Sequence, residues 1–266
     1  NAKVENVSTT GMNTLYTGIL AGYAYASTNS PAHIKGIKTT NNCTVIGQED
    51  TGGIVGGARI NLENCENHSS VQGTQNVGGI AGSSDNKNIK RCTNYGTIVS
   101  DNNYIGGIIG YAYVTSIEDC ANYGKITSTG WHAGGIAGST LKNSSIQNVF
   151  SYGDVTNTND NPGIIIGYVE GGTLTAKGIV AYNRGALLNN SFVNINNIVG
   201  EGRLTFEDGK EEADVVKAFT KQQIKSGEVA WLLNGSTSVP TEGSTLAWYQ
   251  KLLGTDADAY PVLVAE

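Results

Sequence analysis

The sequence contains few charged residues, few prolines and few basic groups, and each scarcity narrows the class of protein. Charged residues make up 15% of the chain, prolines number 4, and the 17 basic residues are outnumbered by 23 acidic ones. Nucleic-acid-binding proteins carry a basic stripe, so we expect no nucleic-acid partner. No apolar run is long enough to cross a membrane as a helix, so we also expect no membrane span in this segment.

Glycine, in contrast, is abundant at 36 of 266 residues, about twice its usual share. The chain is 39% hydrophobic with a net charge of only −6, which allows a buried core and argues against disorder. An ordinary helical enzyme would contain more Ala, Leu, Glu and Lys and less Gly, Asn and Thr. No signal peptide is visible and the chain begins at Asn1, which we interpret as a mature or trimmed segment.

One short phrase repeats along the chain: a glycine, two or three small aliphatic residues and a closing glycine. The closing glycines are 34, 26, 28, 28 and 29 residues apart, at Gly22, Gly56, Gly82, Gly110, Gly138 and Gly167. A second phrase, Cys-x-Asn-Tyr-Gly, keeps step with the first and is complete from Cys92 and from Cys120. Self-similarity at a fixed period is the signature of a repeat architecture.

Each repeat holds short β-prone stretches broken by Gly, Asn, Ser and Asp, and none is long enough for a helix. A unit of this length fits one coil of a solenoid in which equivalent strands of successive coils pair. We therefore predict an all-β solenoid over residues 1–200, a parallel β-helix of ~28-residue coils. We expect it to be right-handed, because crossover connections between parallel strands almost always are.

Equivalent residues of stacked coils form columns, and two columns are predicted to be buried. The first column is aliphatic and consists of Ile54, Ile80, Ile108 and Ile136. The second contains Cys65, Cys92, Cys120 and Val149. Because valine replaces cysteine in one copy, the position suits a small apolar group, and we favour reduced core thiols over disulfides.

Two further columns lie at the turn after each cysteine. Asparagine side chains are predicted to form an amide ladder along the stack, at Asn67, Asn94 and Asn122. Beside it runs an aromatic stripe made of His68, Tyr95, Tyr123, Tyr152 and Tyr182. We favour a structural role, because stacked rings stabilise one another. A platform for a sugar or a protein partner is the alternative, and it makes the stripe the candidate binding site.

The sequence contains no nucleotide-binding loop, nucleophile elbow or paired-cysteine metal motif. We therefore expect no catalytic residues, no metal site and no cofactor. A polysaccharide hydrolase would need two carboxyl groups across a cleft. The residue type at the acidic positions varies from repeat to repeat, as expected for a solvated face. Lys90 and Arg91 are stacked beneath Glu118 and Asp119, and we interpret these residues as cross-coil ion pairs.

The glycine–aliphatic–glycine phrases, with Cys-x-Asn-Tyr-Gly between them, resemble the GLUG-motif repeats of bacterial surface proteins. The resemblance covers roughly residues 40 to 170, with looser copies on either side. It implies an extracellular spacer or adhesin-like arm. Such repeats also occur in immunoglobulin-A metallopeptidases, but the two closely spaced histidines of that active site are missing, since this chain has only His33, His68 and His132.

Residues 201–266 are predicted to form a small mixed α/β segment that caps the last coil, whose strand edges and apolar end must be covered. The spacing of Val215, Val216 and Phe219 predicts one helix. Ser226 and Gly235 are predicted to begin and end a second helix. A third helical stretch is expected over 246–253, and a closing strand over 260–264.

Two functions from different classes remain. The leading hypothesis is a non-catalytic bacterial repeat protein, extracellular or at the cell surface, that is adhesin-like or a spacer. Its partner would be a host or dietary glycan, or a protein at the cell surface. The alternative is a polysaccharide-degrading lyase or hydrolase built on the same β-helix.

Overall fold

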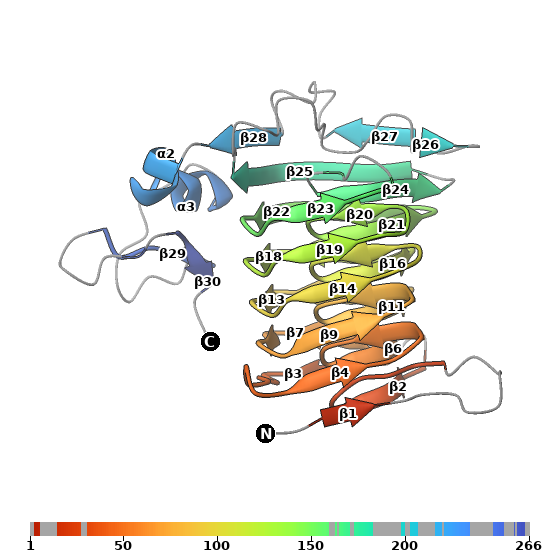
Figure 1. Cartoon of the computed structure of the whole chain (residues 1–266). Helices are drawn as coiled ribbons and strands as arrows, with labels where there is room; N and C mark the ends of the chain where they lie inside the picture. Colours follow the sequence, from red (N-terminus) through yellow and green to blue (C-terminus); the bar gives the residue numbers. More distant parts are fainter. Residues whose placement is uncertain are drawn as a thin grey trace.

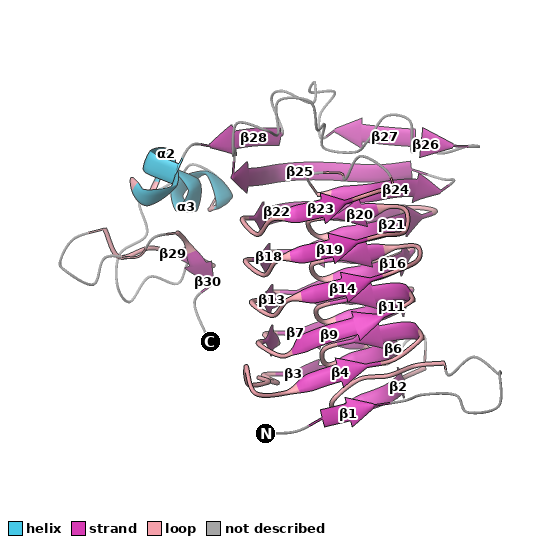
Figure 2. Ribbon diagram, viewed as in Figure 1, coloured by secondary structure: helices cyan, strands magenta, loops and turns pink. Residues whose placement is uncertain are grey.

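Each coil of the chain consists of short strands joined by tight turns, and the strands of successive coils pair side by side (Figure 1). The computed structural model describes residues 3–5, 15–27, 31–159, 163, 165–170, 173–182, 198–199, 203–206, 216–219, 221–234, 247–252, 258 and 260–263. Within these residues the predicted all-β solenoid is confirmed. Figure 2 shows strands throughout the stack and two short helices beside it.

The coils contribute to four parallel sheets, which we call sheets I to IV in chain order. Sheet I contains β1 (Lys3–Glu5), β4 (Thr44–Ile46), β9 (Ser70–Gly73), β14 (Ile98–Ser100), β19 (Ile126–Ser128) and β23 (Val155–Asn157). Sheet II contains β5 (Glu49–Gly52), β10 (Gln75–Gly78), β15 (Ile105–Gly106) and β20 (Ala133–Gly134). Sheet III contains β2 (Ala21–Tyr25), β6 (Val55–Arg59), β11 (Ala81–Asp85), β16 (Ile109–Tyr113), β21 (Ala137–Leu141), β24 (Ile166–Glu170) and β26 (Ile198–Val199).

Sheet IV consists of two ladders that long strands join at the C-terminal end of the stack. The first ladder contains β3 (His33–Lys35), β7 (Asn61–Glu63), β12 (Asn88–Lys90) and β17 (Ser116–Glu118). The second contains β8 (Glu66–Asn67), β13 (Thr93–Asn94) and β18 (Ala121–Asn122). The strands that continue them are β22 (Ser144–Ser151), β25 (Thr173–Tyr182), β27 (Arg203–Phe206) and β28 (Val216–Phe219).

The register between coils follows the sequence period. The backbone N–H of Ile80 donates to the Ile108 carbonyl at 3.0 Å, and that of Ile108 donates to the Ile136 carbonyl at 2.9 Å. All three side chains are fully buried in one apolar cluster, together with Ile54. The predicted aliphatic column is therefore confirmed, and each of its side chains contributes about 1.5–3 kcal/mol of burial.

The cysteine column is also confirmed. Cys65, Cys92 and Cys120 are fully buried free thiols in the same cluster as Val149. Burial raises the pKa of the Cys92 thiol well above its ordinary value, so the reactive thiolate is disfavoured. Cys43 lies outside the column and is only half-buried.

This difference predicts two classes of thiol in a labelling experiment. In the native protein we expect a thiol reagent to modify Cys43 quickly, whereas Cys65, Cys92 and Cys120 react only through unfolding. Time-resolved labelling followed by peptide mass spectrometry measures this directly. Rapid native labelling of any thiol of the buried column, or recovery of a disulfide between two of them, would contradict the assignment.

The C-terminal elements differ in part from the prediction. The helix expected around Val215, Val216 and Phe219 is wrong, because β28 pairs there in parallel with β25. The helix expected over 246–253 is also wrong in its described part, where β29 (Trp248–Tyr249) pairs antiparallel with β30 (Val262–Leu263). The open edge of a parallel sheet offers more hydrogen bonds than a short isolated helix.

The helix expected after Ser226 is present. The two helices are α2 (Lys221–Lys225) and α3 (Glu228–Leu233). The helix begins one residue later than expected, because its N-cap is Gly227 and not Ser226, although the Ser226 hydroxyl accepts from the Glu228 N–H at 3.4 Å. Its C-cap is Asn234, and Gly235 lies outside the described residues. The Asn234 side chain then bonds both backbone polar groups of Trp248, which ties the helix to β29. No helix in the described part of the chain is both long and apolar enough for a membrane span.

Candidate functional site

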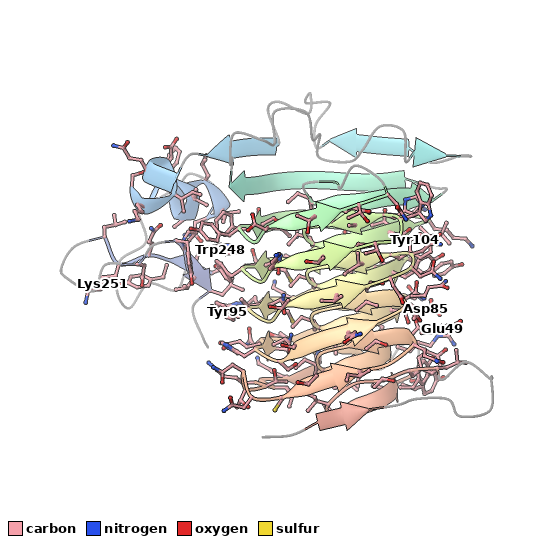
Figure 3. The ribbon with its side chains drawn as sticks, in the orientation of Figure 1. Glu49, Asp85, Tyr95, Tyr104, Trp248 and Lys251 are labelled. Carbon is pink, nitrogen blue, oxygen red and sulfur yellow. The ribbon has the colours of Figure 1, made fainter. Side chains whose placement is uncertain are left out.

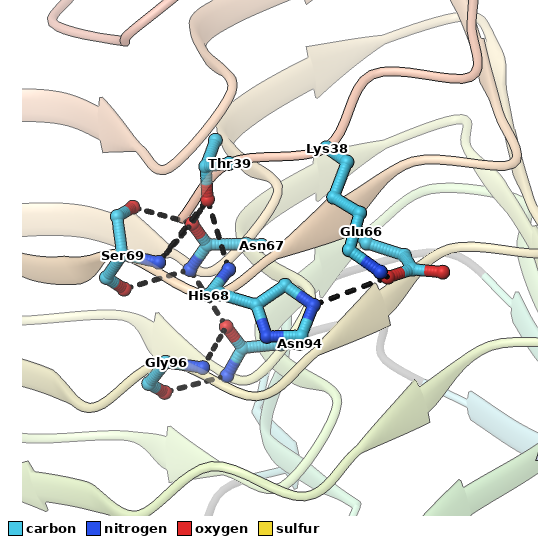
Figure 4. Close-up of polar contacts among 8 residues, drawn as sticks. All are labelled: Lys38, Thr39, Glu66, Asn67, His68, Ser69, Asn94 and Gly96. Atoms are coloured by element: carbon cyan, nitrogen blue, oxygen red, sulfur yellow. Dashed lines mark hydrogen bonds and ion pairs between the residues drawn. The ribbon is translucent and has the colours of Figure 1, made fainter. Parts of the chain in front are cut away.

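Buried asparagines link the coils at the turn that precedes the aromatic stripe. The Asn67 amide donates to Asn94 Oδ1 at 2.8 Å, and the Asn94 amide donates to Asn122 Oδ1 at 2.8 Å. All three side chains are fully buried, so the predicted ladder is confirmed. Each amide also donates to a carbonyl two residues further along its own coil, at Ser69, Gly96 and Gly124. Figure 4 shows the first two of these bonds.

The ladder places the next residue of each coil at the surface. The rings of His68 and Tyr95 stack with centroids 4.5 Å apart, and those of Tyr95 and Tyr123 with centroids 4.9 Å apart. Tyr152 continues the row at 6.4 Å from Tyr123 but is tilted by 50°. The backbone of Tyr182 belongs to β25, and its side chain lies outside the described residues. The stacking is confirmed for the first three rings, whereas ligand binding stays a prediction.

The N-terminal end of the stripe carries charge. Lys38 Nζ lies 2.6 Å from Glu66 Oε2, and His68 Nε2 lies 3.1 Å from the same oxygen (Figure 4). Burial alone would raise the pKa of Glu66, but the hydrogen bonds from Lys38 and His68 outweigh it and lower the pKa. A carboxylate, an ammonium group and two stacked, half-buried rings therefore meet at one corner of the solenoid.

The protein's own C-terminal segment covers the other end of the stripe. The ring of Tyr260 stacks on Tyr123 with centroids 4.5 Å apart and lies 5.0 Å from the ring of Tyr152. The Tyr123 hydroxyl donates to the Pro261 carbonyl. Burial raises the pKa of Tyr123 well above its ordinary value. Tyr123 and Tyr152 therefore hold the C-terminal segment against the solenoid. Figure 1 shows α2, α3, β29 and β30 beside the stack.

A neighbouring column explains why the segment docks at this end, and sequence reasoning missed it. The outward residues of the second ladder of sheet IV change along the stack from Glu66 to Thr93, Ala121 and Phe150. Ala121 and Phe150 are fully buried with Trp248 in one apolar cluster. Figure 3 shows Trp248 beside the edge of the stack. The sequence could have revealed this docking surface, because the outward residues of the column become apolar toward the C-terminal end of the stack, and an apolar patch of this kind indicates a covered surface.

The docking predicts a local effect for Phe150→Thr, which introduces the residue type found at the equivalent Thr93. The change removes a buried ring from beneath α3 and β29, so the C-terminal segment should detach more often. We expect proteolysis within residues 220–266 to become at least tenfold faster, with the solenoid itself intact by circular dichroism. Unchanged proteolysis would contradict the role of Phe150 in docking.

Ion pairs cross between coils on the first ladder of sheet IV. Lys90 Nζ lies 3.1 Å from Glu118 Oε1, which confirms part of the predicted cross-coil pairing. Two coils earlier, Lys35 Nζ lies 3.3 Å from Glu63 Oε1. These side chains are substantially exposed, so such pairs contribute little to stability. Among the described residues, no three His, Cys, Asp or Glu side chains lie close enough together to hold a metal ion.

Comparison with known proteins identifies one coil. Residues 101–127 match the family model described as the GLUG motif. The matched segment begins in the turn after β14, contains β15 to β18 and ends within β19. Its strands pair in register with both neighbouring coils. No curated protein and no solved structure was found to match the chain. The repeat predicted from the sequence is therefore confirmed.

Proposed function

We propose, from the premise that this chain is a GLUG-motif repeat protein, that it is a non-catalytic display or spacer module. In this proposal the module is bacterial, lies outside the cell or on its surface, and is adhesin-like. The stacked register supports this role, because each coil extends the body by ~4.8 Å and repeats the same internal bonds. The module would present one surface to a protein or glycan partner.

The observation that carries the proposal is the half-covered aromatic stripe. Its C-terminal half already binds a peptide segment, since Tyr260 stacks on Tyr123 and Pro261 accepts a hydrogen bond from the Tyr123 hydroxyl. Its N-terminal half, with His68 and Tyr95, has the same stacked geometry, and among the described residues no ring of the C-terminal segment stacks on it, although both side chains are half-buried. A protein segment with an aromatic residue is therefore the partner that this surface fits best, because stacking and one polar contact are reproduced.

The test measures binding of the full chain to surface glycoproteins, before and after their glycans are removed. We expect Tyr95→Ala to lower binding at least tenfold in both conditions. The matched control is Tyr25→Ala, which removes a tyrosine that is 65% exposed and lies on sheet III. Equal binding by the two variants would remove the stripe from the proposal. If Tyr95→Ala loses binding only to the glycosylated proteins, the partner is a glycan. Glycan cleavage by the pure protein would favour the alternative, a polysaccharide-degrading enzyme.

A further inference from the structure

A cleft of about 380 Å³ lies on the outer face of sheet IV, where the C-terminal segment approaches the first ladder. Ala247 forms its wall on the side of the C-terminal segment. On the solenoid side, the polar side chains that matter are Asn61, Glu63, Asn88, Lys90, Arg91 and Asp119. This volume is within the range of small-molecule sites, and the cleft is separate from the aromatic stripe.

Two residues of the cleft, Arg91 and Asp119, replace the asparagine that other coils have at the same position. The turn after each strand of the first ladder has a left-handed residue, and φ is 51° at Asn64 and 50° at Asn148. Asparagine and aspartate both tolerate this conformation better than most residues do. In the two coils between them the same position holds Arg91 at 52° and Asp119 at 50°. Left-handed residues other than asparagine also occur in turns away from the cleft, at Tyr104, Val114 and Lys142, so the cleft is marked by its side chains and not by its backbone conformation.

The lining alternates in charge and in hydrogen-bonding character. Lys90 and Arg91 face Glu63 and Asp119 across the lining, and His33 Nδ1 lies 3.5 Å from Glu63 Oε2, so charges of both signs are interspersed in the cleft. Asp119 is only 7% exposed, and burial with the nearby Glu118 charge raises the pKa of its carboxyl. Sugar hydroxyl groups both donate and accept, so they match closely spaced donors and acceptors.

We propose that this cleft binds a neutral saccharide, with Arg91 and Asp119 as principal hydrogen-bonding partners of its hydroxyl groups. The side-chain amides of Asn61 and Asn88 extend the polar surface along the stack. The proposal is independent of the partner surface at His68 and Tyr95. A chain that fails to bind glycoproteins through the stripe still binds the saccharide.

The test uses the full chain on an array of neutral and sialylated oligosaccharides, followed by titration calorimetry with the neutral compound that binds best. The variants are Arg91→Asn and Asp119→Asn, which introduce the residue that the repeat itself has at Asn64 and Asn148. We expect each to weaken binding at least tenfold while the melting temperature stays equal or rises. The matched control is Lys142→Asn, which also relieves a left-handed residue (φ 55°) but lies over the Tyr113 ring on sheet III.

Each outcome of the array and the titrations either supports the saccharide site or contradicts it. Retained binding in the Lys142 control, with loss in both cleft variants, supports the site. No binding to any neutral oligosaccharide, preference for sialylated compounds, or equal binding by all variants would overturn it.

Discussion

Asn94→Ala is expected to lower the free energy of unfolding by roughly 3–6 kcal/mol, because it leaves several buried polar groups without partners. The Asn94 amide donates to Asn122 Oδ1 and to the Gly96 carbonyl, and its oxygen accepts from the Asn67 amide at 2.8 Å. Alanine replaces none of these bonds, and the site is closed to water. Urea denaturation followed by circular dichroism measures the change.

The control for this prediction is Asn88→Ala on the neighbouring strand β12. Asn88 is exposed, so its removal should change stability by no more than about 0.5 kcal/mol. If both variants lose the same small amount, the amide ladder contributes little and the coils are held by apolar burial alone.

Gly79→Ala is expected to cost at least about 3 kcal/mol, because the new methyl group has no space. A Cβ at Gly79 would lie well inside 3 Å of both the Gly107 carbonyl oxygen and the Asn94 side chain. The same relation holds one coil earlier and one coil later, where Gly53 meets Asn67 and Gly107 meets Asn122. The glycine directly before the isoleucine of each repeat therefore makes room for the asparagine ladder.

Gly36→Ala separates this steric effect from backbone conformation. Gly36 has a φ of +70°, but nothing lies within 4 Å of a Cβ built there. Its replacement should therefore cost only the left-handed strain, about 1–2 kcal/mol. Equilibrium unfolding of the two variants gives the comparison, and a Gly79→Ala protein as stable as Gly36→Ala would contradict the close packing of the coils.

The solenoid could be predicted from the sequence because a fixed period imposes a register. Once Ile80 is paired with Ile108, the positions of Cys92, Asn94 and Tyr95 follow from their spacing alone. The amide ladder and the free thiols were therefore foreseen. No comparable constraint acted on the C-terminal segment, which has no repeat.

The errors in that segment arise from tertiary contacts that override local preference. The helical spacing around Val216 competes with the edge of β25, and pairing with that edge determines the structure. Trp248 lies in a short strand that is fixed by Asn234 and buried against Phe150. The docking surface could have been predicted from the sequence, since the column from Glu66 to Phe150 becomes apolar along the stack.

The polar cleft was not predicted because its two walls are distant in sequence. Lys90, Arg91 and Asp119 were interpreted only as members of cross-coil ion pairs, and Lys90 does pair with Glu118. What the sequence did not reveal is that Ala247 lies opposite them. The sequence offered one indication of the cleft: Arg91 and Asp119 stand where the neighbouring coils have Asn64 and Asn148.

The most direct test of the stacked register is a series of electron paramagnetic resonance distances. In a Cys43→Ser background, spin labels at Gln72 are combined with labels at Val99, Thr127 or Thr156, which lie in register on β9, β14, β19 and β23. A single stack predicts three distances that rise in equal steps of ~4.8 Å. Distances that do not rise in equal steps would contradict it.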